Sequence, residues 1–299
     1  MTMVDVRSNH ILFANSSQSN NYKLSRPTYP TTLYDTIFSE LKKTSAAAGR
    51  QSKLSLDTSP TYDLAVDIAT GTGQVVDAIV SHFKHILATD ISKSQLSEAK
   101  PHPNVTYQCR DASDTGLSDT SVDLITVGQA MHWFDQPAFF SEAARILRPG
   151  GLLAYWTYDF GHLTEPGSPE DAVFRKLRWG TLNGYWAPGM DSVVRKYEDV
   201  YPGDYFKAIQ RYDLKLDDVY FNIDDMANYT RSWSGYQTYR KKNPSHDPVD
   251  DLYEGMAKVV KQRRDVAATA EAATNANRFL YRRALTLFIA HTPKLLKRA

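Results

Sequence analysis

The chain has 299 residues, of which 42% are hydrophobic, so it can form one large core or a domain with a cap. Its formal net charge of +1 gives no reason to expect nucleic acid or another polyanion as a partner. No apolar run approaches the ~20 residues of a membrane-spanning helix, and polar residues interrupt the amino-terminal segment where a signal peptide needs an apolar core. We therefore expect a cytoplasmic protein with no membrane partner.

The first part of the chain leads into a predicted helix. Residues 1–20 are polar, rich in Asn and Ser and without periodicity, so we expect them to be mobile. A proline-punctuated stretch over 22–30 follows, and Thr31 and Thr32 are expected to cap a helix with apolar positions at helical spacing. Residues 44–61 are predicted to form a loop, and 21–299 a single domain.

The stretch 64–73 predicts a strand followed by a tight turn. An apolar run contains Asp67 and ends in Gly71 and Gly73, after which helical apolar spacing begins. Glycines let a ligand approach the backbone, and the new helix directs free N–H groups at the same place. Val76 stands where the dinucleotide fingerprint needs its third glycine, which favours a mononucleotide-like ligand. This pattern alone also fits a turn with no ligand.

Two later strands also end in carboxylates. The stretch 85–90 ends in Asp90, where one carboxylate can accept hydrogen bonds from both hydroxyls of a ribose. The stretch 105–112 is the next strand, and Asp111 at its end is placed to accept from an adenine amino group. Cys109, the single cysteine, cannot form an internal disulfide and is expected to be a buried strand residue.

The fourth and fifth strands flank a helix. Strand 122–127 leads into the exit segment 128–134, at the edge of the sheet where open α/β folds bind ligands. The helix that follows is expected to be capped near Asp135 and to be stopped by residues 149–151. Strand five is predicted over 152–158.

The remaining chain predicts a cap and two more strands. Residues 159–207 carry prolines, glycines and many aromatics, which could form a core of their own or line a substrate site. A sixth strand is predicted over 212–220, and 223–225 should cap a helix through Trp233. A further helix within 249–272 and a last strand over 284–290 complete the chain. Strands alternate with helices up to about residue 158, which indicates an α/β fold with a parallel sheet over this part of the chain.

These motifs together resemble the class I S-adenosylmethionine-dependent methyltransferases. The resemblance covers residues 62–158 and rests on Asp67-x-x-x-Gly71-x-Gly73, Asp90, Arg110-Asp111-Ala112 and the run from Gln129 to Asp135. It implies a Rossmann-like seven-stranded sheet with helices on both faces, an aromatic-rich cap inserted after strand five, and S-adenosyl-L-methionine as cofactor. Cap segments are expected at about 159–207 and 222–275.

A narrower resemblance rests on three segments. The run from Gln129 to Asp135, the segment 22–30 and Arg231-x-Trp233-Ser234-x-Tyr236 are similar to the fungal trans-aconitate methyltransferases and their cantharidin-methylating relatives. Ala69 departs from the family pattern, because it replaces the first glycine of D-x-G-x-G-x-G. Since alanine tolerates positive φ poorly, we expect an intact turn only if this position does not need positive φ.

The resemblance implies two sets of site residues. The cofactor-binding set is Tyr22, Arg26, Asp67, Ala69, Gly71, Gly73, Asp90, Ile91, Gln95, Asp111, Ala112, Gln129 and Ala130. The substrate-binding set is Tyr29, His132, Trp133, Trp156, Tyr158, Tyr185, Trp186, Arg231, Trp233 and Tyr236. Segment 22–30 could close over the cofactor or only pack on the sheet. No metal site is expected, because His82 and His85 have no accompanying ligand set.

The role of His132 stays open among catalytic base, positioning hydrogen bond and packing beside Trp133. An ionised carboxylate needs no base to accept a methyl group, only desolvation and alignment. The interpretation we favour is an O-methyltransferase that esterifies a di- or tricarboxylic acid. Arg231, expected on one helix with Trp233 and Tyr236, would hold a second carboxylate through its guanidinium fork.

Other functions fit the sequence as well. They are methylation of a hydroxyl of a secondary metabolite, a methyltransferase fold that binds cofactor without transferring methyl, and an NAD-dependent oxidoreductase. The missing third glycine disfavours the last. The partner is expected to be a small-molecule acceptor, with the protein a monomer or a weak homodimer.

Overall fold

The computed structural model of the chain describes residues 28–50 and 62–294. The expected mobile segment 1–20 and the candidate residues Tyr22 and Arg26 lie outside these residues. No helix within the described part is long and apolar enough to cross a membrane.

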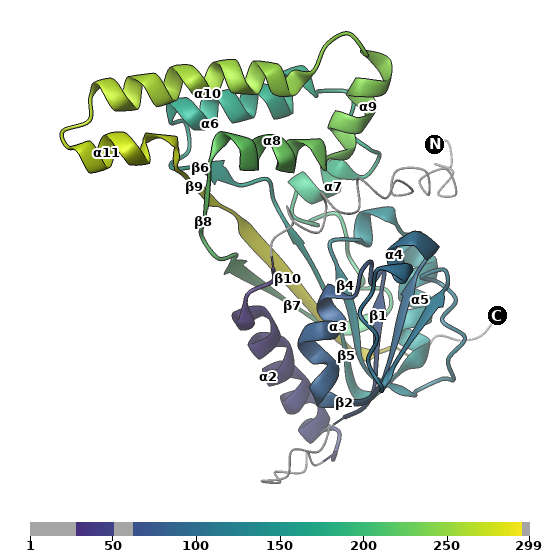
Figure 1. Cartoon of the computed structure of the whole chain (residues 1–299). Helices are drawn as coiled ribbons and strands as arrows, with labels where there is room; N and C mark the ends of the chain where they lie inside the picture. The colour runs from purple at the N-terminus through teal and green to yellow at the C-terminus, as the bar shows by residue number, and fades with distance from the viewer. Residues whose placement is uncertain (1–27, 51–61, 295–299) are drawn as a thin grey trace.

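A seven-stranded sheet forms the centre of the fold (Figure 1). Its strand order is β3-β2-β1-β4-β5-β10-β7; the first five strands are parallel, and β10 runs antiparallel to both neighbours. The strands are β1 (Tyr62–Ile68), β2 (Phe83–Asp90), β3 (Val105–Cys109), β4 (Val122–Gly128), β5 (Leu147–Tyr158), β7 (Phe206–Lys215) and β10 (Ala284–Pro293). The predicted seven-stranded, Rossmann-like sheet is thereby confirmed.

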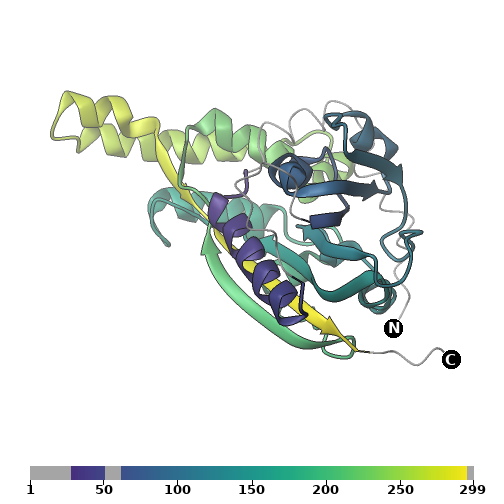
Figure 2. The same ribbon diagram turned by 90° about the horizontal axis from the view of Figure 1, so that it is seen from below.

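Helices cover both faces of this sheet. They are α2 (Thr31–Ala47), α3 (Gln74–Ile79), η2 (Val80–His82), α4 (Lys93–Ser97), η3 (Met131–Trp133) and α5 (Gln136–Ile146). One buried apolar cluster gathers around α5 and a second around α2 and α3, and Figure 2 shows α2 lying along β10. Because both faces are covered, every residue of β4 except the last is buried, as expected for a central parallel strand.

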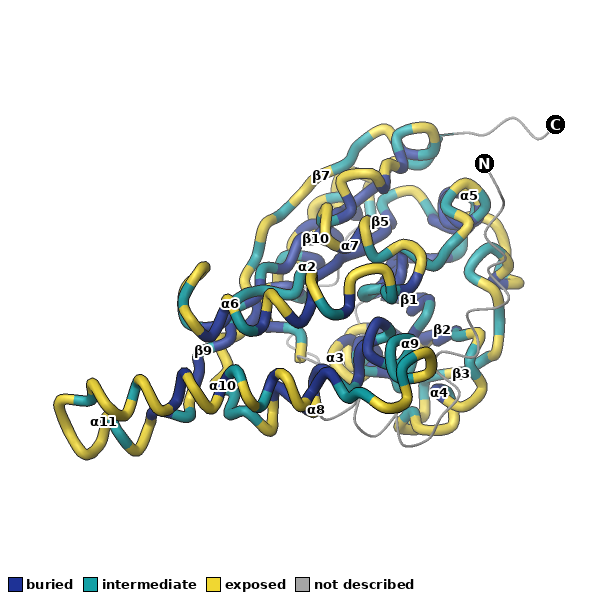
Figure 3. The backbone as a smooth tube through the Cα atoms, turned by 90° about the horizontal axis from the view of Figure 1, so that it is seen from above, coloured by how far each residue is buried: buried dark blue, intermediate teal, exposed yellow. Residues whose placement is uncertain are grey.

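The segments between β5 and β7, and between β7 and β10, build a cap with a second sheet. Its strands, in the order β6-β9-β8, are β6 (His162–Leu163), β8 (Val219–Phe221) and β9 (Phe279–Arg282). Its helices are α6 (Pro169–Arg175), η4 (Lys176–Thr181), α8 (Ile223–Arg231), α9 (Ser234–Lys242), α10 (Pro248–Asp265), α11 (Ala270–Thr274) and η5 (Asn275–Asn277). Helix α7 (Met190–Val194), from the same stretch, packs instead against η3 and the cluster around α5. Figure 3 shows buried and exposed residues alternating along α10, which has one buried and one exposed face as an amphipathic helix does.

The cap has its own aromatic core, while other aromatics of the same stretch belong to the sheet. Phe174, Trp233 and Tyr281 are buried in a third cluster within the cap. Tyr197 and Phe206 are instead buried in the cluster around α5. The aromatic-rich stretch after β5 therefore serves two cores.

Several predicted boundaries are wrong for reasons that depend on distant contacts. Helix α2 starts at Thr31 with Pro30 as its N-cap and without a side-chain cap, and it continues to Ala47, into the predicted loop. Its last turn is held from across the fold, because the Thr44 hydroxyl donates to the carbonyl of Gly150 at 2.8 Å. Helix α5 begins after Asp135, whose side chain accepts from Ala138 N, as predicted.

Strand β5 starts at Leu147, directly after α5, instead of at Leu152. The strand therefore includes the predicted stop at 149–151, and its pairing with β4 shifts register between Val122 and Leu124. The predicted strand 212–220 is also wrong in its bounds, because β7 ends at Lys215 and the following residues join the cap sheet as β8.

The predicted single helix through Trp233 is two helices. Asn222, not 223–225, caps α8 in a capping box with Asp225, and α8 ends at Arg231. Trp233 is the N-cap of α9, with extended backbone, so it does not share a helix with Arg231. Cys109 is exposed, contrary to expectation, because β3 is an edge strand of the sheet.

A buried carboxylate fixes the amino ends of β1 and β4. Asp123 is completely buried and accepts from the backbone N–H groups of Asp63 and Leu64 at 2.9 and 3.1 Å. Arg50 donates to it at 2.5 Å, and Arg148 lies 3.3 Å away. Since these partners come from different segments, Asp123 connects the two strands and the chain around them.

Replacing Asp123 by alanine should lower the free energy of unfolding by about 3–5 kcal/mol. The guanidinium groups of Arg50 and Arg148 and two backbone N–H groups of β1 would lose their acceptor. Urea unfolding measures the loss. Lys84→Ala removes the exposed Lys84–Asp63 ion pair of 2.8 Å and serves as the control, with an expected loss below about 1 kcal/mol. Similar losses in the two variants would contradict this role for Asp123.

Candidate active site

The turn after β1 is left-handed at three positions. Ala69, Gly71 and Gly73 have φ values of 55°, 58° and 84°. The expectation that the turn is intact only without positive φ at position 69 is wrong, because Ala69 adopts positive φ and the turn is still formed. Thr70 N donates to Thr89 O at 2.9 Å and Gly73 N to Thr70 O at 3.0 Å. A left-handed alanine costs roughly 1–2 kcal/mol, a strain that folded proteins tolerate mainly at functional sites.

Asp90 ties this turn to the end of β2. Its Oδ2 accepts from Gly71 N at 2.9 Å, and its Oδ1 accepts from Ser92 N at 2.8 Å. Ile91 beside it is exposed, with 39% of its surface accessible. The carboxylate therefore holds the glycine turn and the β2 exit in one place.

Two buried acceptors flank the same turn without a hydrogen-bond partner among the described residues: Asp67 Oδ2 and Gln95 Oε1. A Cβ on Gly71 would lie 3.7 Å from Gln95 Oε1, so this acceptor is close to the turn. The other oxygen of Asp67 accepts from the Thr126 hydroxyl at 2.7 Å. Burial raises the pKa of Asp67 to about 6, and the hydroxyls of Thr70 and Thr126 oppose the rise.

Asp111 lies beyond the last residue of β3 and is exposed. Its Oδ1 accepts from Ser113 N at 2.9 Å and from the Ser113 hydroxyl at 2.6 Å. Ala112 packs against the cluster around α5. The structure therefore places the third acidic strand end at the same edge, in a more open position than the other two.

The exit of β4 is bonded to the end of β5 through Gln129. Gln129 has a φ of 56°, and its side-chain oxygen accepts from Tyr158 N at 2.8 Å while its amide nitrogen donates to Tyr158 O at 3.2 Å. Ala130 beside it is buried. These two hydrogen bonds to the Tyr158 backbone, which the sequence did not predict, align the two strand ends.

His132 is held by a buried tyrosine. Its Nδ1 lies 2.8 Å from the Tyr197 hydroxyl, and its ring lies 4.6 Å from the Trp133 ring. Burial raises the pKa of Tyr197, so this hydroxyl keeps its proton at neutral pH. Sequence reasoning assigned no role to Tyr197, because its contact with His132 spans 65 residues.

Aromatic side chains line the carboxyl edge on the face covered by α2. Trp156 and Tyr158 are buried at the end of β5, and the Tyr29 ring lies 5.2 Å and 6.4 Å from theirs. A Cβ on Gly128 would lie 2.9 Å from Trp156 and 3.1 Å from the Tyr29 hydroxyl, so any larger residue at 128 would disturb this packing.

The candidate residues of the cap fall into two groups. Trp186 and Trp233 lie 4.9 Å and 5.3 Å from the ring of Phe160, two residues beyond β5. The other group contacts α8, α9 and α10. Tyr185 packs on Tyr239 at 4.8 Å, the Tyr236 hydroxyl donates to Asp247 at 3.1 Å, and Arg231 donates to Asn228 at 3.2 Å.

The two groups adjoin, because the Trp233 ring lies 5.2 Å from that of Tyr229 in α8 and a Cβ on Gly235 of α9 would lie 2.9 Å from Trp186. Burial and Asp247 raise the pKa of Tyr236, and the nearby Arg231 guanidinium opposes this rise. These contacts place the Arg231 side chain at the junction of α8, α9 and α10, within the cap.

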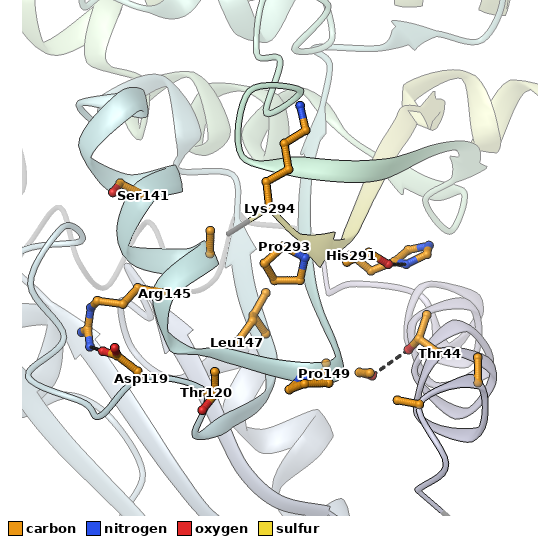
Figure 4. Close-up of a pocket in the computed structure, with 16 residues that line it drawn as sticks. Thr44, Asp119, Thr120, Ser141, Arg145, Leu147, Pro149, His291, Pro293 and Lys294 are labelled. Atoms are coloured by element: carbon orange, nitrogen blue, oxygen red, sulfur yellow. Dashed lines mark hydrogen bonds and ion pairs between the residues drawn. The ribbon is translucent and has the colours of Figure 1, made fainter. Parts of the chain in front are cut away.

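A cavity of about 760 Å³ opens at the other end of the sheet (Figure 4). Thr120, Leu147 and Pro149 line it at the start of β4 and β5, together with Thr44 of α2 and His291 of β10. Open α/β sheets bind ligands at the carboxyl ends of their strands, so this cavity is separate from the glycine turn.

Comparisons with known proteins agree with this geometry. A model of the methyltransferase domain matches residues 66–155, from β1 to β5. A protein named "Putative methyltransferase" in Dictyostelium discoideum is 32% identical over 246 residues, covering 82% of this chain and 85% of that protein. The chain belongs to the class I S-adenosylmethionine-dependent methyltransferases.

Two further similarities extend over the cap. A protein of Saccharomyces cerevisiae named "Probable S-adenosylmethionine-dependent methyltransferase" is 22% identical, covering 79% of this chain and 85% of its own length. The solved structure of a putative type II methyltransferase from Anaeromyxobacter dehalogenans is 28% identical with a TM-score of 0.61, covering 89% of this chain and 96% of that one.

The cofactor of this methyltransferase is S-adenosylmethionine, and the residues of the glycine turn fit it. Asp67 Oδ2 and Gln95 Oε1 are buried acceptors without a hydrogen-bond partner among the described residues. S-adenosylmethionine carries suitable donors, namely an ammonium group, an amino group and two hydroxyls. The left-handed turn leaves open space at Gly71 for close backbone approach.

Replacing Asp90 by alanine should weaken S-adenosylmethionine binding by about 2–4 kcal/mol, because the ribose hydroxyls would lose a charged acceptor and the turn its anchor. Titration calorimetry measures the change. Asp114→Ala removes an exposed carboxylate nearby and should leave the affinity unchanged. A Kd for Asp90→Ala within threefold of the unmodified protein would refute the assignment.

In the cofactor-free protein, Asp67 should contribute stability that is lost as the pH rises from about 4 to about 6. The pKa of Asp67 is raised on folding, so the folded state binds this proton more tightly and its contribution of ~1–3 kcal/mol disappears as Asp67 ionises. Asp67→Asn should flatten this part of the profile in urea unfolding. An unchanged pH profile in the variant would show that Asp67 titrates normally.

Proposed function

We propose that the protein transfers a methyl group from S-adenosylmethionine to a carboxylate oxygen of a small di- or tricarboxylic acid, giving a methyl ester. The observation that carries this proposal is the hydrogen bond between His132 Nδ1 and the buried hydroxyl of Tyr197. The similarity of the β4 exit to the trans-aconitate methyltransferases supports it.

The hydrogen bond favours one form of the imidazole. A tyrosine hydroxyl that keeps its proton can donate a hydrogen bond to Nδ1. The neutral imidazole then carries its own hydrogen on Nε2. In that form His132 is a hydrogen-bond donor toward the acceptor and not a base. A donor suits a carboxylate, which is already charged, better than a hydroxyl that must lose a proton.

When bound, S-adenosylmethionine supplies a methyl group whose C–S bond breaks as the new C–O bond forms, leaving S-adenosylhomocysteine. A carboxylate acceptor releases no proton in this exchange, whereas a hydroxyl acceptor releases one. The task of the protein is therefore to desolvate and align the acid. The buried rings of Trp156 and Tyr158 supply an apolar surface for this at the carboxyl edge.

Arg231 remains a proposed partner for a second carboxylate, although its position is less suited than expected. Its guanidinium is half-buried and already donates to Asn228. An acid bound there would have to compete with these contacts within the cap.

The experiment that tests the proposal uses labelled S-adenosylmethionine with a panel of acceptors: trans-aconitate, other di- and tricarboxylates, phenols and amines. Label transfer to the acids, with no proton release in weakly buffered solution, is the expected outcome. Transfer to phenols with release of one proton per turnover would replace this proposal by the hydroxyl alternative.

His132→Gln should retain most of the rate with a carboxylate acceptor, because glutamine can still donate a hydrogen bond and no base is lost. With a hydroxyl acceptor the loss of a general base would reduce the rate by ~10²–10⁴-fold. The pH dependence of kcat separates the two cases. A rate that rises through the range where histidine titrates, and becomes flat in His132→Gln, would contradict the carboxylate proposal.

A further inference from the structure

A buried arginine at the junction of the cap and the sheet has unpaired nitrogens. Arg283 lies between β9 and β10, and only 6% of its surface is exposed. Its Nε and Nη1 are buried and have no hydrogen-bond partner among the described residues. An unpaired buried guanidinium is costly, since desolvation of a charge is not repaid without an acceptor.

Three tyrosine rings surround this guanidinium. Their centroids lie 4.7 Å, 5.7 Å and 5.9 Å from it and belong to Tyr281 of β9, Tyr158 of β5 and Tyr229 of α8. Cation–π contacts offset part of the desolvation, but ring faces do not accept the in-plane N–H hydrogens of a guanidinium as a carboxylate does. The cluster therefore supplies donors and aromatic surface and lacks an acceptor.

Arg178 is a second buried arginine of the cap, and its partners can be compared with those of Arg283. It is 3% exposed, and its Nη1 donates to the carbonyls of Phe160 and Gly161, both at 3.0 Å. Asp171 lies 3.9 Å from its Nη2. Arg178 thus has acceptors at Nη1 and a carboxylate near Nη2, with its Nε unpaired, whereas Arg283 lacks a hydrogen-bond partner at both Nε and Nη1 within the described part of the chain.

Arg283 also lies at the carboxyl edge of the sheet, where the glycine turn is. Leu285 pairs with Tyr158, so Arg283 stands two residues before this pair, beyond the carboxyl end of β5. The backbone of the same Tyr158 is bonded to Gln129 at the exit of β4. In Figure 1 the long segment of β9 and β10 runs from the cap into the sheet, and Arg283 is at that crossing.

We propose that Arg283 binds a carboxylate of the acceptor, the one that is not methylated, and that Tyr158 and Tyr229 contact a planar, unsaturated or aromatic body of the same acid. This inference rests on the proposed function and specifies its substrate class. The guanidinium fork matches a carboxylate bidentately. The same charge disfavours cationic amines as acceptors.

The first test compares two acids. Arg283→Met, which keeps much of the length and removes the charge, should reduce kcat/KM for trans-aconitate at least 30-fold. Crotonate, an unsaturated acid with a single carboxylate, should be affected less than threefold. Arg283→Lys should show an intermediate loss on trans-aconitate because it keeps the charge and loses the fork. The matched control is Arg175→Met, which removes an exposed arginine of α6.

The second test needs no turnover. Because Arg283 is an unpaired buried charge, Arg283→Met should raise Tm by about 2–4 °C, whereas loss of a structural arginine would lower it. Trans-aconitate, added with S-adenosylhomocysteine, should raise Tm of the unmodified protein and not that of Arg283→Met. S-adenosylhomocysteine alone should bind both proteins with the same Kd in calorimetry.

The outcomes separate this inference from the proposed function. If acids bind in an Arg283-dependent way but accept no methyl group, the proposed function fails and the anion site stands. If acids are methylated and Arg283→Met leaves kcat/KM unchanged, or lowers it equally for both acids, the inference is overturned. A loss confined to Arg231→Ala, measured in parallel on trans-aconitate, would assign the second carboxylate to Arg231 instead.

Discussion

The backbone turn between β1 and α3 is the constraint on which the rest of the site depends. It turns through left-handed conformations at Ala69, Gly71 and Gly73, and only two of these residues are glycines. Asp90 offsets this strain by binding Gly71 N and Ser92 N, which ties the turn to the next strand. Parallel pairing of β1 with β2 and β4 then brings the ends of all three strands to the same edge. The site is a consequence of this register.

The two faces of the sheet have different roles at that edge. On the α5 side, Tyr197 holds His132, and both belong to segments that pack around α5. On the α2 side, Tyr29, Trp156 and Tyr158 form an aromatic surface. Gln129 connects the two sides, since its side chain binds the Tyr158 backbone from the β4 exit that leads to His132. A small shift of β5 against β4 would therefore move both sides together.

The sequence predicted what local patterns determine and missed what distant contacts determine. The strand, turn and helix around Asp67 follow from apolar spacing and glycines, and the parallel direction of the central strands follows from their alternation with helices. The burial of Arg283 has no local pattern, because its neighbours Tyr158, Tyr229 and Tyr281 come from three elements. The exposure of Cys109 depends in the same way on β3 being an edge strand.

The unpaired polar atoms of the site differ in kind from one end to the other. Among the described residues, those around the glycine turn are the acceptors Asp67 Oδ2 and Gln95 Oε1 together with the hydroxyls of Thr70 and Thr89. Those around the end of β5 are the donors Trp156 Nε1 and Arg283 Nε and Nη1 together with the Thr157 hydroxyl. Folding alone would favour pairing or removing such groups, because each costs about 1–3 kcal/mol when buried without a partner. A cationic methyl donor satisfies acceptors, and an anionic acid satisfies donors. The acceptors at the glycine turn thus suit the cationic cofactor, and the donors near the end of β5 suit the anionic acceptor that we propose.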